Sequence, residues 1–197
     1  MQIECMRNSL SNQLGRIRSI ALLSEEIVPP LDRIDIRLLG LVQDNADLSL
    51  EALAARVSLS TSQCSRRLQQ LREDGYISHV ATVLDPKRLG LGLKAYVMVV
   101  LRPQPDGPAA FYEHMRRSPE VLECCMITGD ADYMLKICTR DLHSFSAFLQ
   151  ELAATNLVAS TRSSIVVEER KSTTALPVEL SVQGPAGRQA PGGRRAL

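Results

Sequence analysis

An acidic loop between two apolar runs is the part of this sequence whose residue types most directly suggest binding. It reads Met126-Ile-Thr-Gly-Asp-Ala-Asp-Tyr-Met-Leu135, and no nucleophile or second set of metal ligands stands near it. Gly129 lets backbone N–H groups approach a carboxylate, and an Asp side chain can pair with an ammonium group. These groups suit a free amino acid, whose aliphatic side chain could lie against Met126, Met134 or Leu135.

Two other interpretations of the loop stay open on the residues alone. Gly and Asp are good turn formers, so the loop can be a hairpin turn between strands and nothing more. Asp130 and Asp132 also form an Asp-x-Asp pair, but a metal would need further oxygen ligands that the sequence does not mark. We therefore predict no metal site and no cofactor other than an amino-acid effector.

A polar helix face in the first half of the chain suits contact with DNA. Residues 31–75 repeat apolar side chains every three or four positions, which indicates helices that begin after Asp32, Ser49 and Ser60. The third helix opens with Ser60-Thr-Ser-Gln63, a capping-box pattern, after a short turn typical of a helix-turn-helix. Projected at about 100° per residue, its apolar side chains fall on one face, which we predict to be the core. They are Cys64, Leu68 and Leu71.

The opposite face of that helix carries side chains that can reach base edges or phosphates. A merely solvated face is the alternative, but the caps and the short turn favour double-stranded DNA as the partner. The predicted contacts are Ser60, Ser62, Gln63, Arg66, Arg67 and Gln70. Arg67 lies at the edge of the face, so we expect it to contact phosphate. Residues 75–84 alternate like a hairpin strand, which makes the module look winged.

In the second half of the chain, the apolar residues no longer follow helical spacing throughout. β-like runs over residues 93–101, 121–127, 133–139 and 158–167 alternate with helical stretches over 109–117 and 143–154. This order predicts a ferredoxin-like βαββαβ domain. The run Ala95–Leu101 is apolar on both faces, and two helices can cover only one. We therefore expect a second copy of the sheet to cover the other.

Composition sets limits on the partner and the compartment. Lys and Arg number 23 against 22 Asp and Glu, so a DNA site must be a local patch. The five cysteines lack zinc-site spacing and are read as reduced thiols. The sequence shows no signal peptide, and its longest uncharged apolar run is too short to span a bilayer. We predict a cytoplasmic, nucleoid-associated protein without a membrane partner.

These observations divide the chain into five segments of an α+β protein. In chain order they are an N-terminal extension (1–30), a winged helix-turn-helix DNA-binding domain (31–85), a linker (86–92), a ferredoxin-like ligand-sensing and oligomerisation domain (93–178) and a disordered tail (179–197).

Several motifs carry a family likeness across both halves. The first half holds Leu31-Asp-Arg-Ile-Asp-Ile-Arg-Leu-Leu39, Leu53-Ala-x-x-Val57, Cys64-x-x-Arg67 and Asp74-Gly-Tyr-Ile77. The second holds Thr128-Gly-Asp-x-Asp-Tyr133, Thr161-Arg-Ser-Ser-Ile-Val-Val167 and Thr174-Ala-Leu-Pro177. In this order they resemble the Lrp/AsnC family of prokaryotic transcription regulators, over about residues 31–178.

The resemblance implies dimers that pack sheet to sheet and assemble into tetramers or octamers. It also implies that the acidic loop lies at an interface between dimers and binds an amino-acid effector. The effector contacts are then Met126, Thr128, Gly129, Asp130, Asp132, Tyr133, Thr161 and Ser163. Tyr133 would either close the pocket or pack at the contact between dimers.

We interpret the protein as a sequence-specific DNA-binding transcription regulator whose activity depends on an amino acid or a related metabolite. One alternative is an architectural protein that binds DNA without an effector. The other is a small ferredoxin-like enzyme. His79, His114 and His143 fall in separate elements, and no carboxylate pair is placed with a base, so we predict no catalytic residues and no enzyme.

Overall fold

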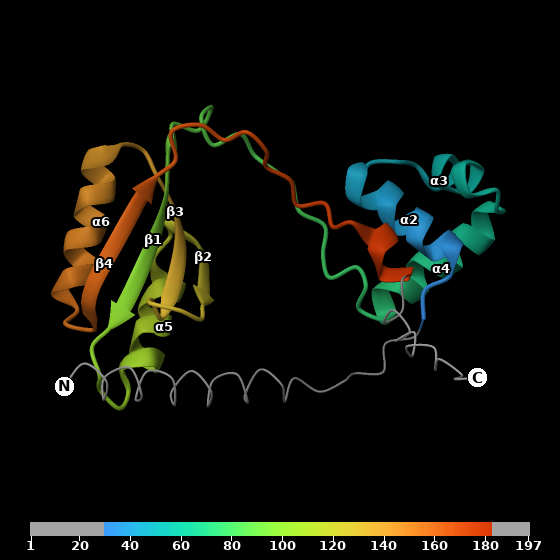
Figure 1. The fold of residues 1–197 in the computed structure, drawn as a ribbon. Coiled ribbons are helices and arrows are strands. Elements are labelled where there is room, and N and C mark those ends of the chain that lie inside the picture. Colours follow the sequence, from blue (N-terminus) through green and yellow to red (C-terminus); the bar gives the residue numbers. More distant parts are fainter. Residues whose placement is uncertain (1–29, 183–197) are drawn as a thin grey trace, which may run out of the picture. The chain divides into compact units, whose positions relative to one another are not determined.

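The computed structural model describes residues 30–182, in which the chain forms two units. Residues 30–82 and 173–182 make up a helical unit, and residues 83–172 make up a sheet unit (Figure 1). The other residues, 1–29 and 183–197, hold most of the predicted extension and tail and lie outside the described part.

Three helices build the helical unit where the sequence predicts them. They are α2 (Arg33–Asp44), α3 (Leu50–Val57) and α4 (Thr61–Glu73). The side chains of Asp32, Ser49 and Ser60 accept hydrogen bonds from backbone N–H groups of the respective first turns. These caps satisfy donors that a helix cannot pair internally, which explains where each helix begins.

The apolar faces of these helices meet in one core. Cys64, Leu68 and Leu71 of α4 are all buried there, which confirms the predicted inner face. Between α3 and α4 the chain turns at Ser58, whose φ of 58° and ψ of 42° place it in the left-handed region. The short helix-turn-helix connection is thus present, with serine in a conformation that glycine adopts more easily.

The strand expected over residues 75–84 does not form. The described chain contains no strand between α4 and residue 93, although apolar and polar residues alternate there as in a strand. Val80, Val83 and Leu84 are exposed. Alternation alone does not make a strand, because a lone extended segment has no neighbour to complete its hydrogen bonds.

The sheet unit has the predicted order of elements. They are β1 (Leu93–Leu101), α5 (Gly107–Arg117), β2 (Val121–Met126), β3 (Tyr133–Thr139), α6 (Leu142–Ala154) and β4 (Val158–Ile165). The strands form one sheet in the order β2-β3-β1-β4, with every neighbouring pair antiparallel. This is the ferredoxin-like arrangement expected from the sequence.

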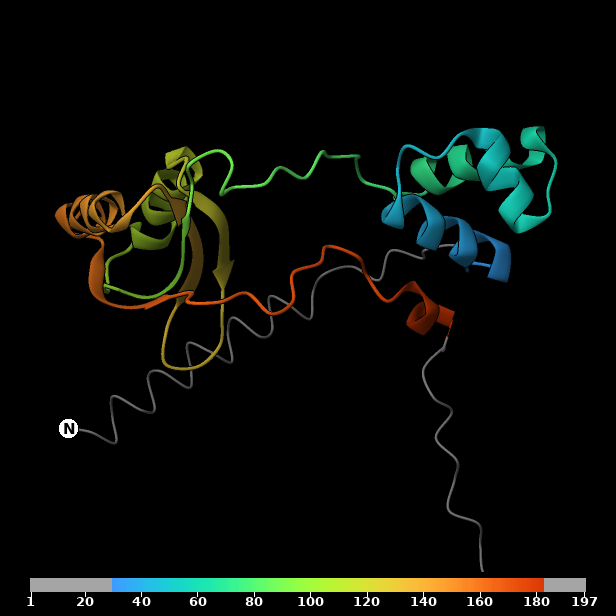
Figure 2. The ribbon, with the colours of Figure 1, turned by 90° about the horizontal axis from the view of Figure 1, so that it is seen from above.

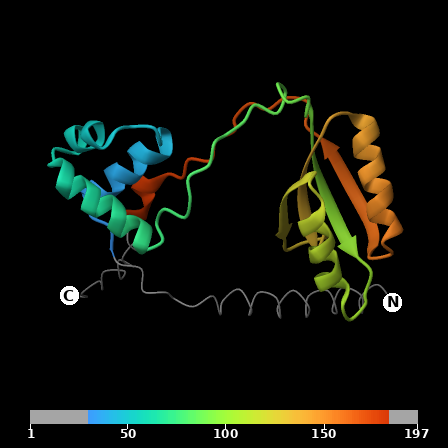
Figure 3. The same cartoon turned by 180° about the vertical axis from the view of Figure 1, so that it is seen from behind.

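Both helices of this unit cover the same face of the sheet (Figures 2 and 3). Ala95, Val97 and Val99 of β1 point into that core and are fully buried. The intervening side chains of β1 lie on the other face and are only partly buried. The core is therefore one-sided, as two helices on one sheet require.

The open face of the sheet is mixed in character. Tyr96, Met98 and Val100 make its centre apolar, as predicted. The edge strand β4 adds polar side chains, including Arg162, which pairs in register with Met98. Burying this face would therefore remove both apolar and charged groups from water.

The end of the described chain differs from the prediction. Residues 173–182 belong to the helical unit, and Val178–Val182 form a short 3-10 helix, η1. The predicted boundary at 178 and the predicted disorder from 179 onward are thus wrong for residues 179–182. The reason is a set of contacts with α2 that lie more than 130 positions away in sequence.

Candidate functional site

The outer face of α4 presents the predicted DNA contacts to solvent, with one exception. Ser60, Ser62, Gln63, Arg66 and Gln70 are exposed. Arg66 makes no ion pair with any other residue in the described chain. Its guanidinium is therefore available for a phosphate or the edge of a base.

Gln63 caps the start of α4 with its side-chain oxygen and keeps its side-chain NH₂ as a donor. Its side-chain oxygen accepts a hydrogen bond from the Ser60 amide at 3.1 Å, while the Ser60 hydroxyl accepts from the Gln63 amide at 3.3 Å. This is the predicted capping box, and it leaves the side-chain NH₂ of Gln63 without an acceptor among the described residues. The helix entry is thus fixed without a proline.

The two glutamines in the second half of α4 are held along the helix. Gln70 donates to the Asp74 carboxylate at 2.9 Å, and Gln69 donates to the Glu73 carboxylate at 2.8 Å. Both pairs are four residues apart, where helical side chains meet. The Gln70 amide therefore already has an acidic partner that DNA would have to displace.

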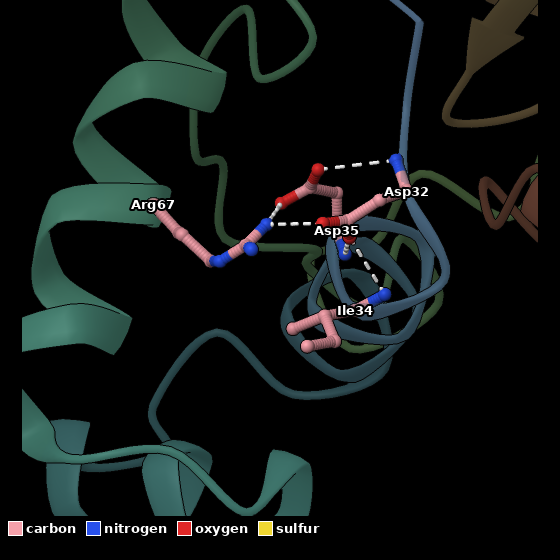
Figure 4. Close-up of polar contacts among 4 residues, drawn as sticks. All are labelled: Asp32, Ile34, Asp35 and Arg67. Carbon is pink, nitrogen blue, oxygen red and sulfur yellow. Dashed lines mark hydrogen bonds and ion pairs between the residues drawn. The ribbon is translucent and has the colours of Figure 1, made fainter.

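Arg67 is the exception, because its guanidinium is directed into the unit. Its Nη1 lies 2.7 Å from Asp32 Oδ2 and 2.7 Å from Asp35 Oδ1 (Figure 4). Asp32 is also the N-cap of α2 and accepts from the amides of Ile34 and Asp35. The ion pairs therefore link α4 to the start of α2, and the predicted phosphate contact of Arg67 has carboxylate competitors.

The ionisation of this cluster reflects its contacts. Burial alone would raise the pKa of Asp32, but the Asp35 amide and the Arg67 guanidinium outweigh it and lower that pKa. The hydrogen bonds to Asp35 and then Asp32 raise the pKa of Arg67. Asp32 and Arg67 are therefore ionised at neutral pH. Sequence patterning identified Asp32 as a cap, but it gave no signal for the contact with Arg67.

The acidic loop joins β2 to β3 in the sheet unit. Gly129 has a φ of 111°, a conformation that favours glycine, and the space where a Cβ would lie is open. The Asp130 side chain is exposed and makes no hydrogen bond or ion pair that involves another residue of the range 30–182. Met126 and Thr128 are exposed beside it. Empty space beside the Gly129 Cα and a free Asp130 carboxylate thus lie together.

Asp132 has a structural role in the same loop. Its Oδ2 accepts a hydrogen bond from the Leu101 amide at 2.9 Å, and its own amide donates to the Val99 carbonyl at 2.9 Å. These bonds extend the pairing of β1 and β3 beyond the last ladder residues. The two aspartates of the loop are therefore not equivalent, and Asp130 is the better candidate for an ammonium.

The structure places other predicted effector residues apart from the loop. Tyr133 is buried and its ring centroid lies 4.8 Å from that of Phe111, so it packs under α5. Leu135 is fully buried by the helices and does not line the loop, which corrects the expectation that it receives a ligand side chain. Thr161 and Ser163 are exposed on β4, with β1 between them and β3.

The described residues show neither a metal-binding cluster nor a membrane-spanning helix. Across residues 30–182, no three His, Cys, Asp or Glu side chains gather closely enough to hold a metal ion. Nor does this part of the chain contain a helix with the length and apolar character needed to cross a membrane.

Comparison with known proteins decides the family. Residues 31–78 match the winged helix-turn-helix DNA-binding family, and residues 94–176 match the Lrp/AsnC ligand binding domain. The DNA-binding transcriptional activator DecR of Escherichia coli K12 is 34% identical over 151 residues, which are 76% of this chain and 99% of the relative. This chain belongs to the Lrp/AsnC family. It is a transcription regulator, and the fold class predicted from the sequence is confirmed.

Two further transcriptional regulators are similar to this chain. The transcriptional regulator NMB0573 of Neisseria meningitidis, solved in complex with L-Met, matches with a TM-score of 0.75 and 38% identity. That match covers 76% of this chain and 98% of the Neisseria chain. The Bkd operon transcriptional regulator of Pseudomonas aeruginosa is 40% identical over 120 residues, 60% of this chain and 78% of the relative.

Proposed function

We propose that this Lrp/AsnC regulator reads DNA with the outer face of α4 and senses an amino acid at the loop between β2 and β3. The observation that carries the proposal is an exposed Asp130 carboxylate, without a polar partner in residues 30–182, next to the empty space where a Cβ of residue 129 would lie. The ammonium and carboxylate of an α-amino acid are bonded to the same carbon, so their binding groups must also lie side by side. The L-Met complex of the Neisseria relative supports an amino acid as the ligand class.

The DNA contacts of this proposal centre on the first half of α4. Arg66 supplies a free guanidinium, and Gln63 supplies an amide donor beside it. Arginine and glutamine are residues that bind base edges in the major groove with paired hydrogen bonds. Ser60 and Ser62 lie at the N-terminus of the helix, where hydroxyl and backbone N–H groups suit phosphate.

The proposed working form is a homo-oligomer built on the open face of the sheet. Tyr96, Met98 and Val100 leave an apolar strip there that the helices of the same chain do not cover. Pairing two such strips removes them from water at both copies. We propose a dimer of this kind as the unit from which a tetramer or octamer forms, acting in the cytoplasm on nucleoid DNA.

The experiment that tests the proposal is a screen of the twenty common amino acids by thermal shift on the full chain. A ligand that binds only the native state raises the melting temperature. We expect at least one amino acid to do so and to change the mobility of a protein–DNA complex in a gel. An unchanged melting temperature with all twenty would favour an architectural protein without an effector.

The same samples also test whether the protein converts any of the amino acids. A regulator binds its effector and releases it unchanged, so chromatography of each amino acid after incubation should recover it intact. Conversion of any of them in the absence of DNA would contradict the proposal and favour an enzyme.

A further inference from the structure

The segment that follows β4 returns to the DNA-binding unit. Residues 173–182, here named the C-terminal strap, pack with residues 30–82 in one unit (Figure 1). The strap contains the motif Thr174-Ala-Leu-Pro177, which neither the DNA face nor the effector loop uses. The hydrogen bonds of Leu176 with α2 show that this motif is part of a docked segment.

A single glutamine makes the principal polar contact with the strap. Gln43 of α2 donates from Nε2 to the Leu176 carbonyl at 2.8 Å and accepts at Oε1 from the Leu176 amide at 3.0 Å. A carboxamide is a side chain that can donate and accept at once, so it pairs with a peptide group as a neighbouring strand would. The contact therefore selects one register of the strap.

An apolar contact follows two residues later. Val178 is partly buried and packs on the core that contains Leu38 and Leu68. The strap is also shaped locally for this docking, because the Ala175 amide donates to the Thr173 hydroxyl and the Leu180 amide donates to the Pro177 carbonyl. The strap thus has a built contact surface and is not a loose end lying on the helix.

The docking changes how the two units are connected. The chain leaves the helical unit after residue 82 and comes back to it at residue 173. A single flexible linker lets a domain sample many orientations, and a second connection that ends in a docked segment removes many of them. Restricting a tethered binding unit raises the effective concentration at which it meets its second site when the geometry fits.

We propose that the C-terminal strap positions the DNA-binding unit, so that two units of an oligomer engage two half-sites together. This inference rests on the proposed function, because it requires an oligomer that binds DNA through α4. It assigns Gln43 and Val178 as positioning residues. Neither lies on the outer face of α4, so neither needs to touch DNA.

The test uses the full chain with Gln43→Ala and Val178→Ser combined. The matched control is Gln104→Ala, which removes another exposed glutamine that donates to a main-chain carbonyl, here that of Asn156 in the sheet unit. Hydrogen exchange at the Leu176 amide reports docking directly. We expect slow exchange in the parent and the control, and fast exchange in the double variant.

DNA binding then reports positioning. The probes are a duplex with two half-sites, selected from a random pool by the parent chain, and the same duplex with one half-site scrambled. We expect the double variant to bind the one-site duplex like the parent and to lose about tenfold or more of the two-site advantage. A purely structural defect would instead weaken both duplexes by the same factor.

The outcomes separate the inference from the proposed function. Three results would each contradict the positioning role of the strap without contradicting the proposed regulator function. They are fast exchange at the Leu176 amide in the parent, an unchanged two-site advantage in the double variant, and equal weakening on both duplexes. A parent that selects no duplex at all would overturn the proposed function and the strap with it.

Discussion

Two neighbouring arginines of α4 have different surroundings. Arg66 is exposed and has no ion-pair partner in the described chain, whereas Arg67 is held by Asp32 and Asp35. Substitution of these residues should therefore separate DNA recognition from folding. The same argument distinguishes Asp130, which is free, from Asp132, which completes the pairing of two strands.

We predict that Arg66→Ala weakens specific binding by about 1–3 kcal/mol if it contacts a base, with no loss of stability. Arg67→Ala should instead lower the free energy of unfolding by about 1 kcal/mol, since it removes two ion pairs at a partly exposed site. Urea denaturation and gel retardation of both variants measure the two quantities. Equal stability loss in the two variants would contradict this assignment.

The sequence could identify the faces of α4 but not the partners on them. The period of a helix is local, so projection places Cys64 inward and Arg66 outward whatever the rest of the chain does. The contact of Arg67 with Asp32 spans 35 positions and depends on how α4 packs against α2. No local pattern encodes such a distance. The capping role of Gln63 is also local, because it follows from its spacing of three residues from Ser60.

The turn between α3 and α4 stores conformational strain at Ser58. A non-glycine residue in the left-handed region pays a steric cost that glycine avoids. We predict that Ser58→Gly raises the free energy of unfolding by about 0.5–1 kcal/mol, with Ser58→Val lowering it, because a β-branched side chain fits this region poorly. Thermal unfolding of both variants checks the order. A less stable Ser58→Gly would show that the serine side chain contributes more than the turn costs.

The start of α2 should make stability depend on acid. The lowered pKa of Asp32 means that the native state binds this proton more weakly than the unfolded chain, where the value is near 3.8. Its contribution is therefore present above pH 3.8 and is lost as the pH falls below it. Asp32→Asn keeps a good N-cap without the charge, so it should lose less stability than the parent between pH 5 and pH 3. Identical acid profiles in urea denaturation would contradict this role.

Helices and strands were predictable where the local pattern and the environment agree. The boundaries of α4, β1 and β3 follow from helix caps and from apolar spacings whose side chains are buried in the core. Residues 75–84 have the pattern of a strand without a neighbouring strand to pair with. The strap was missed for the opposite reason, since its docking on α2 depends on Gln43, a residue whose sequence context marks no contact.

The assembly of the molecule should depend on the sheet unit. We predict that residues 83–172, expressed alone, form at least a dimer at micromolar concentration, because the apolar strip on the open face remains with them. Met98→Glu should disrupt it by placing a charge at the centre of that face. Sedimentation of both samples provides the measurement. A well-folded monomer of residues 83–172 would contradict assembly through this face.

The most direct test of amino-acid-controlled DNA binding is the affinity of the full chain for its selected duplex, with and without the amino acid that raises its melting temperature. The parent, Asp130→Ala and the matched control Asp106→Ala, another exposed aspartate of the sheet unit, are compared. Loss of an exposed turn carboxylate typically changes stability by about half a kcal/mol or less, so all three should fold. We predict equal affinity without effector, and a shift on its addition in the parent and Asp106→Ala only. An equal shift in Asp130→Ala would contradict the account and leave the loop as a turn.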